Sequence, residues 1–271
     1  LHPAPTEGRD EAIARQNAAI DGFFADVFPR LDAQVELRRR RDQALRDEGL
    51  DGKAADASEA GRKAAVTKRI KAEIGEEYGQ ALDEEGRRLL AYGSQGSGKT
   101  RRVIENIATI PRGANVWVLQ LTLAKAEEFA ADYEAAAGPE APPVQVIRGR
   151  DALDSGGDDG QQMCLRADVA RRLATKGYSP SRHLCDDGTS RCPLYHKCGY
   201  QEQRRRANEQ DGAVFVMSHE FLWNQPPVGS CDLLIVDEDV VIKSSARLAF
   251  DPEQLVAQAK ARPSSKVDDP E

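Results

Sequence analysis

Short apolar runs and helical patterns alternate along the middle of the chain. The apolar runs lie at residues 89–92, 115–121, 143–147, 213–217 and 233–236. Between them, residues 101–110 and 122–137 repeat apolar side chains at helical spacing. The last two runs do not alternate with polar residues, so both predict strands buried on two faces. The pattern therefore predicts a doubly wound α/β domain with a parallel sheet over residues 86–250.

Residues 1–85 differ in character and predict a helical N-terminal extension. Apolar spacing indicates helices over residues 12–28, 30–48 and 63–82, with a polar link at 49–61. Four consecutive arginines, at 38–41, could contact nucleic acid. Nearby acids favour an ion-paired, solvated helix face instead; they are Glu36, Asp42, Asp47 and Glu48. Residues 251–271 predict a helical or linker tail.

A glycine-rich motif at residues 93–100 fits G-x-x-x-x-G-K-[ST] between a predicted strand and a predicted helix. Such a loop turns backbone N–H groups toward phosphates, and the following helix adds partial positive charge. Lys99 would reach the β- and γ-phosphates of ATP, and the Thr100 hydroxyl would ligate Mg²⁺. The nucleotide-binding set is Gly93, Ser94, Gln95, Gly96, Ser97, Gly98, Lys99 and Thr100.

A second motif typical of nucleotide sites, an acidic one, follows the apolar run at 233–236. Its Asp237 and Glu238 come at the C-terminal end of a buried strand, where open α/β sheets bind ligands. We expect Asp237 to hold Mg²⁺ through water and Glu238 to polarise the attacking water. Together with Lys99 they form the expected catalytic set. Asp239 is interpreted as a helix cap or surface acid.

The composition limits how this chain could bind nucleic acid and argues against a membrane or secreted protein. The chain has 271 residues, is 40% hydrophobic and carries a formal net charge of −7, so nucleic acid could bind only through a local basic patch. No apolar run approaches a membrane span, and the start shows no secretory signal. The start also lacks Met, so we expect a fragment of a longer cytoplasmic protein with no membrane partner.

Four cysteines lie between the two nucleotide motifs, in the segment 150–210. Their spacing is C-x20-C-x6-C-x5-C, wider than the tight pairs of most structural zinc sites. Tetracysteine ligation of a [4Fe–4S] cluster tolerates such loops, and clustered cysteines in a reducing compartment indicate ligands rather than disulfides. The expected metal ligands are Cys164, Cys185, Cys192 and Cys198.

Two alternatives remain open for these cysteines. Zinc could replace the cluster, with His183 or His196 taking the place of one cysteine. Four free thiols without metal are a further alternative, although the density of loop cysteines argues against it. The fifth cysteine, Cys231, begins a predicted strand and is interpreted as a small buried residue.

The cysteine-rich segment carries its own positive charge. Between Gln161 and Arg206, ten basic and four acidic residues give +6. Tyr178, Tyr195 and Tyr200 are interleaved with them. Basic groups beside aromatic rings suit single-stranded DNA, because charge follows the phosphates and rings stack on bases. A solvated helical surface is the alternative interpretation.

In combination these blocks resemble the iron–sulfur DNA helicases of the DinG and XPD type, in superfamily two. Residues 93–100, 117–129 and 233–239 are similar to helicase motifs I, Ia and II. The residues around Cys164 and Cys192 resemble the family's cluster segment, and 213–219 resembles a strand ending in Asn-His. The resemblance, over residues 86–245, implies a RecA-like domain that uses ATP hydrolysis to move along single-stranded DNA, 5′ to 3′, and a cluster domain that splits a forked duplex.

Some residues depart from the family pattern. Asp239-Val240 replaces the usual Ala-His after the second motif, and Ser218 stands where Asn is usual. The chain also ends before a second RecA-like domain, which would supply an arginine finger, so we expect little hydrolysis from this chain alone. The alternatives are a nucleic-acid-binding or nuclease-associated module that does not unwind, and a zinc-bearing interaction domain on a degenerate ATPase.

Overall fold

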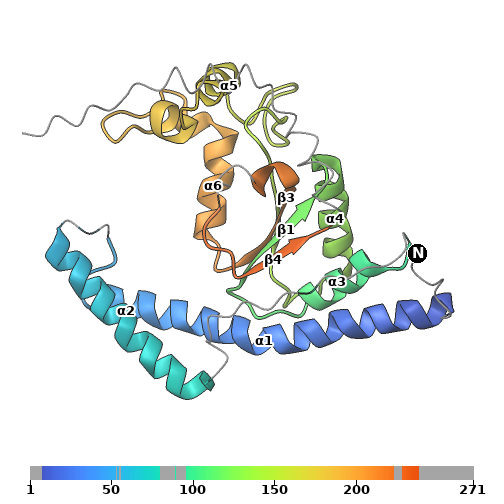
Figure 1. Cartoon of the computed structure of the whole chain (residues 1–271). Coiled ribbons are helices and arrows are strands. Elements are labelled where there is room, and N and C mark those ends of the chain that lie inside the picture. The colour runs from blue at the N-terminus through green and yellow to red at the C-terminus, as the bar shows by residue number, and fades with distance from the viewer. Residues whose placement is uncertain are drawn as a thin grey trace, which may run out of the picture. The chain divides into compact units, whose positions relative to one another are not determined.

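Four strands of the protein form one all-parallel sheet in the order β2-β3-β1-β4 (Figure 1). A computed structural model describes residues 8–52, 54, 56–79, 89, 96–222 and 228–237. The strands are β1 (Asn115–Gln120), β2 (Val144–Ile147), β3 (Ala213–Ser218) and β4 (Leu233–Val236). The parallel sheet with its helices confirms the predicted α/β class. Except for Leu89, the strand predicted at 89–92 lies outside the described residues.

Two helices that follow the predicted pattern pack on this sheet. Helix α3 (Lys99–Ile107) follows the glycine motif, and helix α4 (Leu123–Ala136) follows β1. Helix α4 begins where the Thr122 hydroxyl accepts a hydrogen bond from the Lys125 N–H at 3.2 Å, which satisfies one free donor of the first turn. Their apolar faces join one core with the strands; its members include Ile104, Ile107, Val116, Val118, Phe129, Tyr133, Val214 and Val216.

Burial along the strands follows their position in the sheet. Strand β3 lies between β2 and β1 and is buried from Ala213 to Met217, as predicted. Strand β4 is the edge strand of the described sheet and pairs only with β1. Its Leu234 and Val236 are 49% and 40% exposed. The prediction that this run is buried on both faces is therefore wrong for the part of the chain that is described.

The N-terminal region contains one helix where the sequence predicted two. Helix α1 (Arg9–Asp47) runs 39 residues without a break and includes Pro29. Proline removes one backbone donor and usually ends or kinks a helix. Here Val27 and Leu31, on either side of Pro29, are buried in the same core, which holds both halves of the helix against one surface. Helix α2 (Ala57–Tyr78) begins at an Asp56 cap, earlier than predicted.

The extension shares its core with the α/β part of the chain. Ile20, Phe24, Val27 and Leu31 of α1 pack in the same cluster as Ile104 of α3 and the strands. All described residues belong to one compact unit. None of the described helices combines the length and the apolar character needed to cross a membrane.

The arginine run forms ion pairs, as the solvated-face interpretation expected for Arg39, Arg40 and Arg41, but Arg38 instead contacts the sheet. Arg38 binds Asp232 with both guanidinium nitrogens, at 3.1 and 2.9 Å, and donates to the Gly113 carbonyl at 2.6 Å. These contacts join α1 to the starts of β1 and β4. The other pairs are Arg39 with Glu36, Arg40 with Glu36 and Glu77, and Arg41 with Asp42.

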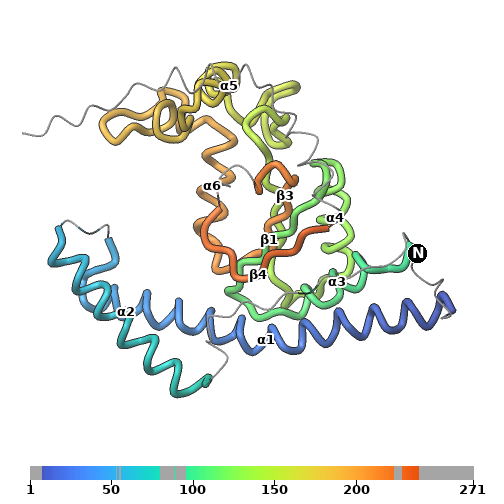
Figure 2. The backbone as a smooth tube through the Cα atoms, in the orientation of Figure 1, coloured from blue at the N-terminus to red at the C-terminus, as the bar shows by residue number. Residues whose placement is uncertain are grey.

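The cysteine-rich segment forms the crossover between two neighbouring strands. Figure 2 follows the backbone from β2 through α5 (Ala167–Thr175) and α6 (Gly199–Glu209) to β3. Helix α6 is fixed to the end of β2, because Gln203 accepts from the Arg148 N–H at 3.0 Å and donates to the Arg148 carbonyl at 2.8 Å. Its Ala207 packs with Phe215 and Met217 of β3. The segment is thus part of the sheet's connectivity.

The turns into β1 and β3 touch each other, which gives a stability prediction. Gly212 has a φ of +79°, and a Cβ there would lie 2.3 Å from the backbone carbon of Gly113. We expect Gly212→Ala to destabilise the protein by about 2–4 kcal/mol, because the clash involves backbone and adds to the unfavourable φ. Urea unfolding measures this. Gly138→Ala, where a Cβ meets nothing within 4 Å, is the control and should change the midpoint little.

Candidate functional site

The described part of the glycine motif turns directly into helix α3. Gly96 and Gly98 have φ angles of +73° and +80°, which glycine adopts without steric cost. Lys99 is the first residue of the helix and Thr100 the second. Both therefore lie at the helix end that carries partial positive charge. Residues 93–95 of the motif lie outside the described residues.

Thr100 meets Asp237, which is 137 positions away in sequence. The Thr100 hydroxyl donates to the Asp237 carboxylate at 3.0 Å, and the Gln120 amide donates to the same oxygen at 3.3 Å. Strand register explains the meeting. Leu119 pairs with Val236, so the next residue of each strand, Gln120 and Asp237, leaves the sheet at the same edge.

This arrangement places oxygen ligands at the carboxyl edge of a parallel sheet. The hydroxyl of Thr100 and the carboxylate of Asp237 are hard oxygen donors of the kind that Mg²⁺ prefers. Both lie beside the N-terminus of α3, where phosphate is favoured. The structure therefore brings together two of the residues predicted to bind ATP and Mg²⁺. Glu238, the third predicted catalytic residue, lies outside the described residues.

Helix α1 adds a residue to this region that the sequence reasoning missed. Gln16 is 8% exposed, and its Oε1 accepts from the Ser97 hydroxyl at 3.2 Å. The Lys99 ammonium donates to the same hydroxyl at 3.3 Å. Gln16 lies four and eight positions before the buried Ile20 and Phe24. A polar residue on the apolar stripe of a helix was the signal that could have revealed it.

A second set of polar contacts ties α1 to α3. The Arg102 guanidinium binds both oxygens of Asp21, at 2.7 and 2.5 Å, and Asn106 donates to Asp21 at 3.0 Å. The hydrogen bond from Arg102 holds the pKa of the Asp21 carboxyl below its usual value. Arg102 also pairs with Glu105 one turn along α3. The helix that follows the glycine motif is thus fixed by the N-terminal helix.

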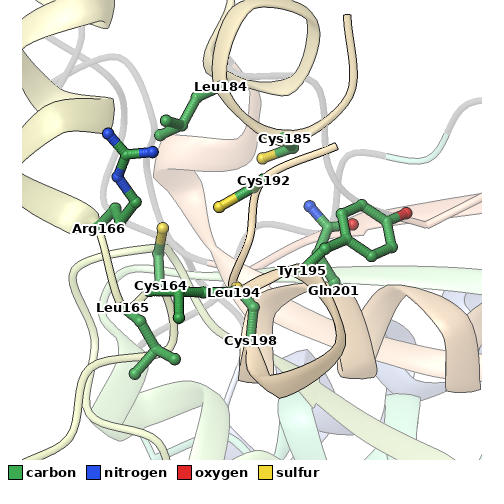
Figure 3. Close-up of a pocket in the computed structure, with 10 residues that line it drawn as sticks. All are labelled: Cys164, Leu165, Arg166, Leu184, Cys185, Cys192, Leu194, Tyr195, Cys198 and Gln201. Atoms are coloured by element: carbon green, nitrogen blue, oxygen red, sulfur yellow. The ribbon is translucent and has the colours of Figure 1, made fainter. Parts of the chain in front are cut away.

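The four predicted metal-ligating cysteines line one pocket (Figure 3). Cys164 precedes α5, Cys198 precedes α6, and Cys185 ends a short helical turn, Ser181–Cys185. These three are between 5% and 7% exposed, whereas Cys192 is half-buried. The remaining wall is mostly apolar and consists of Leu165, Arg166, Leu184, Leu194, Tyr195 and Gln201.

A hairpin brings two of the cysteines together. The Cys192 N–H donates to the Cys185 carbonyl at 3.0 Å, and between them Asp186 pairs with Arg191. Asp187 closes the turn by accepting hydrogen bonds from the backbone and hydroxyl groups of the two residues that follow Gly188. These bonds, first that from the Ser190 N–H, lower the pKa of Asp187. These contacts stabilise the hairpin and so hold Cys185 and Cys192 opposite each other.

Two N–H donors lie beside the sulfur of Cys185. Arg150 donates to the Ser181 hydroxyl at 2.8 Å and lies 3.8 Å from the Cys185 sulfur. Its guanidinium carbon stands 3.8 Å above the Tyr200 ring centre. Gln201 is 6% exposed. Burial raises the pKa of the Cys185 thiol, whereas the Arg150 charge and a hydrogen bond from the Gln201 side chain lower it.

The other two cysteines of the pocket, Cys164 and Cys198, interact with each other, and the Cys198 sulfur also lies 3.4 Å from the Met163 carbonyl oxygen. A hydrogen bond between their sulfur atoms lowers the pKa of Cys198 and raises that of Cys164. Backbone N–H groups of Gln201, Tyr200 and Leu165 also favour the thiolate of Cys198. A thiolate is the form of cysteine that binds metal.

The structure also tests the alternatives for the cysteine segment. His183 and His196 do not line the pocket, and the His183 ring instead bonds the Ser179 carbonyl at 2.9 Å. Among the described residues, no group of three or more Cys, His, Asp or Glu is arranged to hold a metal ion. Cys231 is exposed, so its interpretation as a buried residue is wrong. It lies just before the edge strand β4, which begins at Leu233.

Local ion pairs neutralise much of the positive charge of the cysteine-rich segment. Arg171 pairs with Asp151, and Glu202 binds both Arg205 and Arg206. Arg172 and Arg191 are paired as well. Tyr200 is 7% exposed beneath Arg150, so it cannot stack on a base, whereas Tyr178 is 52% exposed. Between Gln161 and Arg206, the basic residues without an ion pair to another described residue are Arg166, Lys176, Arg182, Lys197 and Arg204.

The fold and site define an α/β protein with an all-parallel four-stranded sheet, a polar cluster at its carboxyl edge and a four-cysteine pocket in one crossover. Comparison of the chain with models of known families, with curated proteins and with solved structures found no match. Function must therefore be argued from the residues themselves.

Proposed function

We propose that this chain is the first motor domain of an ATP-dependent DNA helicase that carries a [4Fe–4S] cluster. The observation that supports it best is the hydrogen bond between Thr100 and Asp237. Residues that the sequence assigned separately to phosphate-loop and acidic motifs meet at the carboxyl edge of a parallel sheet. This is where nucleotide sites lie in such folds, and the sheet is consistent with a RecA-like domain.

In this proposal the chain's own residues divide the work on ATP. Lys99 binds the β- and γ-phosphates, and Thr100 with Asp237 holds Mg²⁺ directly or through water. Glu238 orients the attacking water. Ser97 and Gln16 fix the turn from which Lys99 projects. Phosphoryl transfer depends mainly on such positioning and on charge neutralisation.

The cysteine pocket is the reason for proposing an ATPase that carries a metal cluster. Four cysteines line this one pocket, and three of them are buried. Four cysteine thiolates are the ligand set of a [4Fe–4S] cluster, and the same set is also one that holds zinc. When bound, the cluster would cross-link the turns of the insert, which would act as the wedge that splits a forked duplex.

A module that binds nucleic acid, or assists a nuclease, without unwinding remains the second candidate. It is favoured by Asp239-Val240, which replaces the Ala-His of the helicases that the chain resembles. Both candidates use ATP and single-stranded DNA. Strand displacement on a forked duplex by the protein joined to a second motor domain separates them, because the module would bind the fork and leave it paired.

The first prediction concerns ATP. Lys99→Ala should abolish ATP binding, because it removes the lysine that the phosphate loop supplies to the β- and γ-phosphates. Titration calorimetry with Mg-ATP measures the effect. Lys125→Ala, on the exposed side of α4, removes the same charge away from the site and should bind as the wild type does. Equal affinity in the wild type and Lys99→Ala would contradict the nucleotide assignment.

The second prediction concerns metal. Protein purified without oxygen should contain about four iron and four sulfide per chain. Cys198→Ser should lose them, because Cys198 lines the pocket. Cys231→Ser should keep them, because Cys231 lies elsewhere. Stoichiometric zinc with no iron in the wild type would reject the cluster.

The third prediction concerns DNA and follows from the ion pairs. Replacing Arg166, Lys197 and Arg204 with Ala should weaken binding to any single strand and lower the log–log salt slope by about 2, at 0.7 per lost phosphate contact. Fluorescence anisotropy over a salt series measures both quantities. Replacing Arg171, Arg205 and Arg206 removes the same charge from paired positions and should have a smaller effect. Equal effects of the two triple variants would show that net charge alone governs binding.

A further inference from the structure

His219 lies against the main chain of the acidic motif. It follows β3 directly, begins the short helix His219–Leu222 and is 1% exposed. Its Nε2 stands 2.8 Å from the carbonyl oxygen of Asp237. Because a carbonyl oxygen only accepts hydrogen bonds, Nε2 must carry the proton and donate it. The contact therefore fixes both the tautomer and the orientation of the imidazole.

The carbonyl that accepts this bond belongs to the peptide that joins Asp237 to Glu238 in the sequence. The Asp237 carboxylate is held by Thr100 and Gln120, and the backbone N–H of Asp237 donates to the Leu119 carbonyl at 3.0 Å. His219 adds a contact to the main-chain carbonyl of Asp237. This contact helps to fix the backbone at Asp237 and so restricts the direction of the Asp237 side chain.

Stability alone does not explain a histidine at this position. The Nδ1 of His219 is buried and has no hydrogen-bond partner among the described residues. A buried polar atom without a partner destabilises the fold, and an apolar side chain of similar size would avoid that loss. Each such group in a folded protein calls for an explanation, such as a functional role or a bound water or ion.

We propose that His219 is a positioning residue for the magnesium site, so that the magnesium-dependent part of ATP binding depends on strand β3. The inference rests on the proposed nucleotide function. Strand β3 is also the strand that follows the cysteine segment, and Phe215 and Met217 within it pack on α6. The His219 contact thus joins the element that leaves the cysteine pocket to the acid that would hold Mg²⁺.

The test is the magnesium gain, defined as the dissociation constant of ATP in EDTA divided by that in Mg²⁺. His219→Met keeps most of the volume but loses the donor, and should lower the gain about threefold to tenfold, the range for one hydrogen bond. His219→Gln places an amide N–H within reach of the same oxygen and should restore most of it. His183→Met makes the same replacement at an exposed histidine that bonds the Ser179 carbonyl; it is the control and should keep the wild-type gain.

Two results would overturn the inference. One is a folded His219→Met protein whose magnesium gain equals that of a wild type with a clear gain; the nucleotide function would then stand without it. The other needs no variant: ¹⁵N NMR of the wild-type imidazole should show a proton on Nε2, and its absence from Nε2 would remove the contact. A wild type that binds no ATP would instead refute the proposed function, and this inference with it.

Discussion

The carboxylate of Asp237 is the point on which the candidate nucleotide site depends. It receives hydrogen bonds from the Thr100 hydroxyl and the Gln120 amide, so the contact joins three separate parts of the chain. The contacts exist because β4 pairs with β1 in the register that sets Leu119 beside Val236. A shift of one residue would turn the acid to the other face of the sheet. Strand register, rather than any single loop, therefore assembles the site.

The cysteine pocket is built on a different principle. Local turns, a hairpin and the starts of two helices place the sulfurs, with little help from the sheet. The two regions are joined through α6. Its first turn belongs to the cluster that contains Cys198 and Tyr200, and its last turn, at Ala207, belongs to the sheet core. One helix is thus shared by the pocket and by the strand that leads to His219.

The sequence predicted what local pattern controls. Apolar runs located β1 to β4, and motif spacing identified Thr100 and Asp237, because both signals are written in consecutive residues. What it missed depends on distant partners. Nothing near Gln16 indicates Ser97, nothing near Arg38 indicates Asp232, and the continuity of α1 through Pro29 depends on the core beneath it. Long-range ion pairs such as that of Arg102 with Asp21 were hidden for the same reason, since these partners became neighbours only on folding.

Helix α1 has a consequence for where this protein can be divided. The change in composition near residue 86 resembles a domain boundary, yet Ile20, Phe24 and Leu31 are buried against α3 and the strands. A chain shortened to residues 86–237 would leave that core face open to water and would lose Gln16 from beside Ser97. The smallest piece that can fold as this one does therefore begins at α1. The helix could not be exchanged between proteins as an independent module.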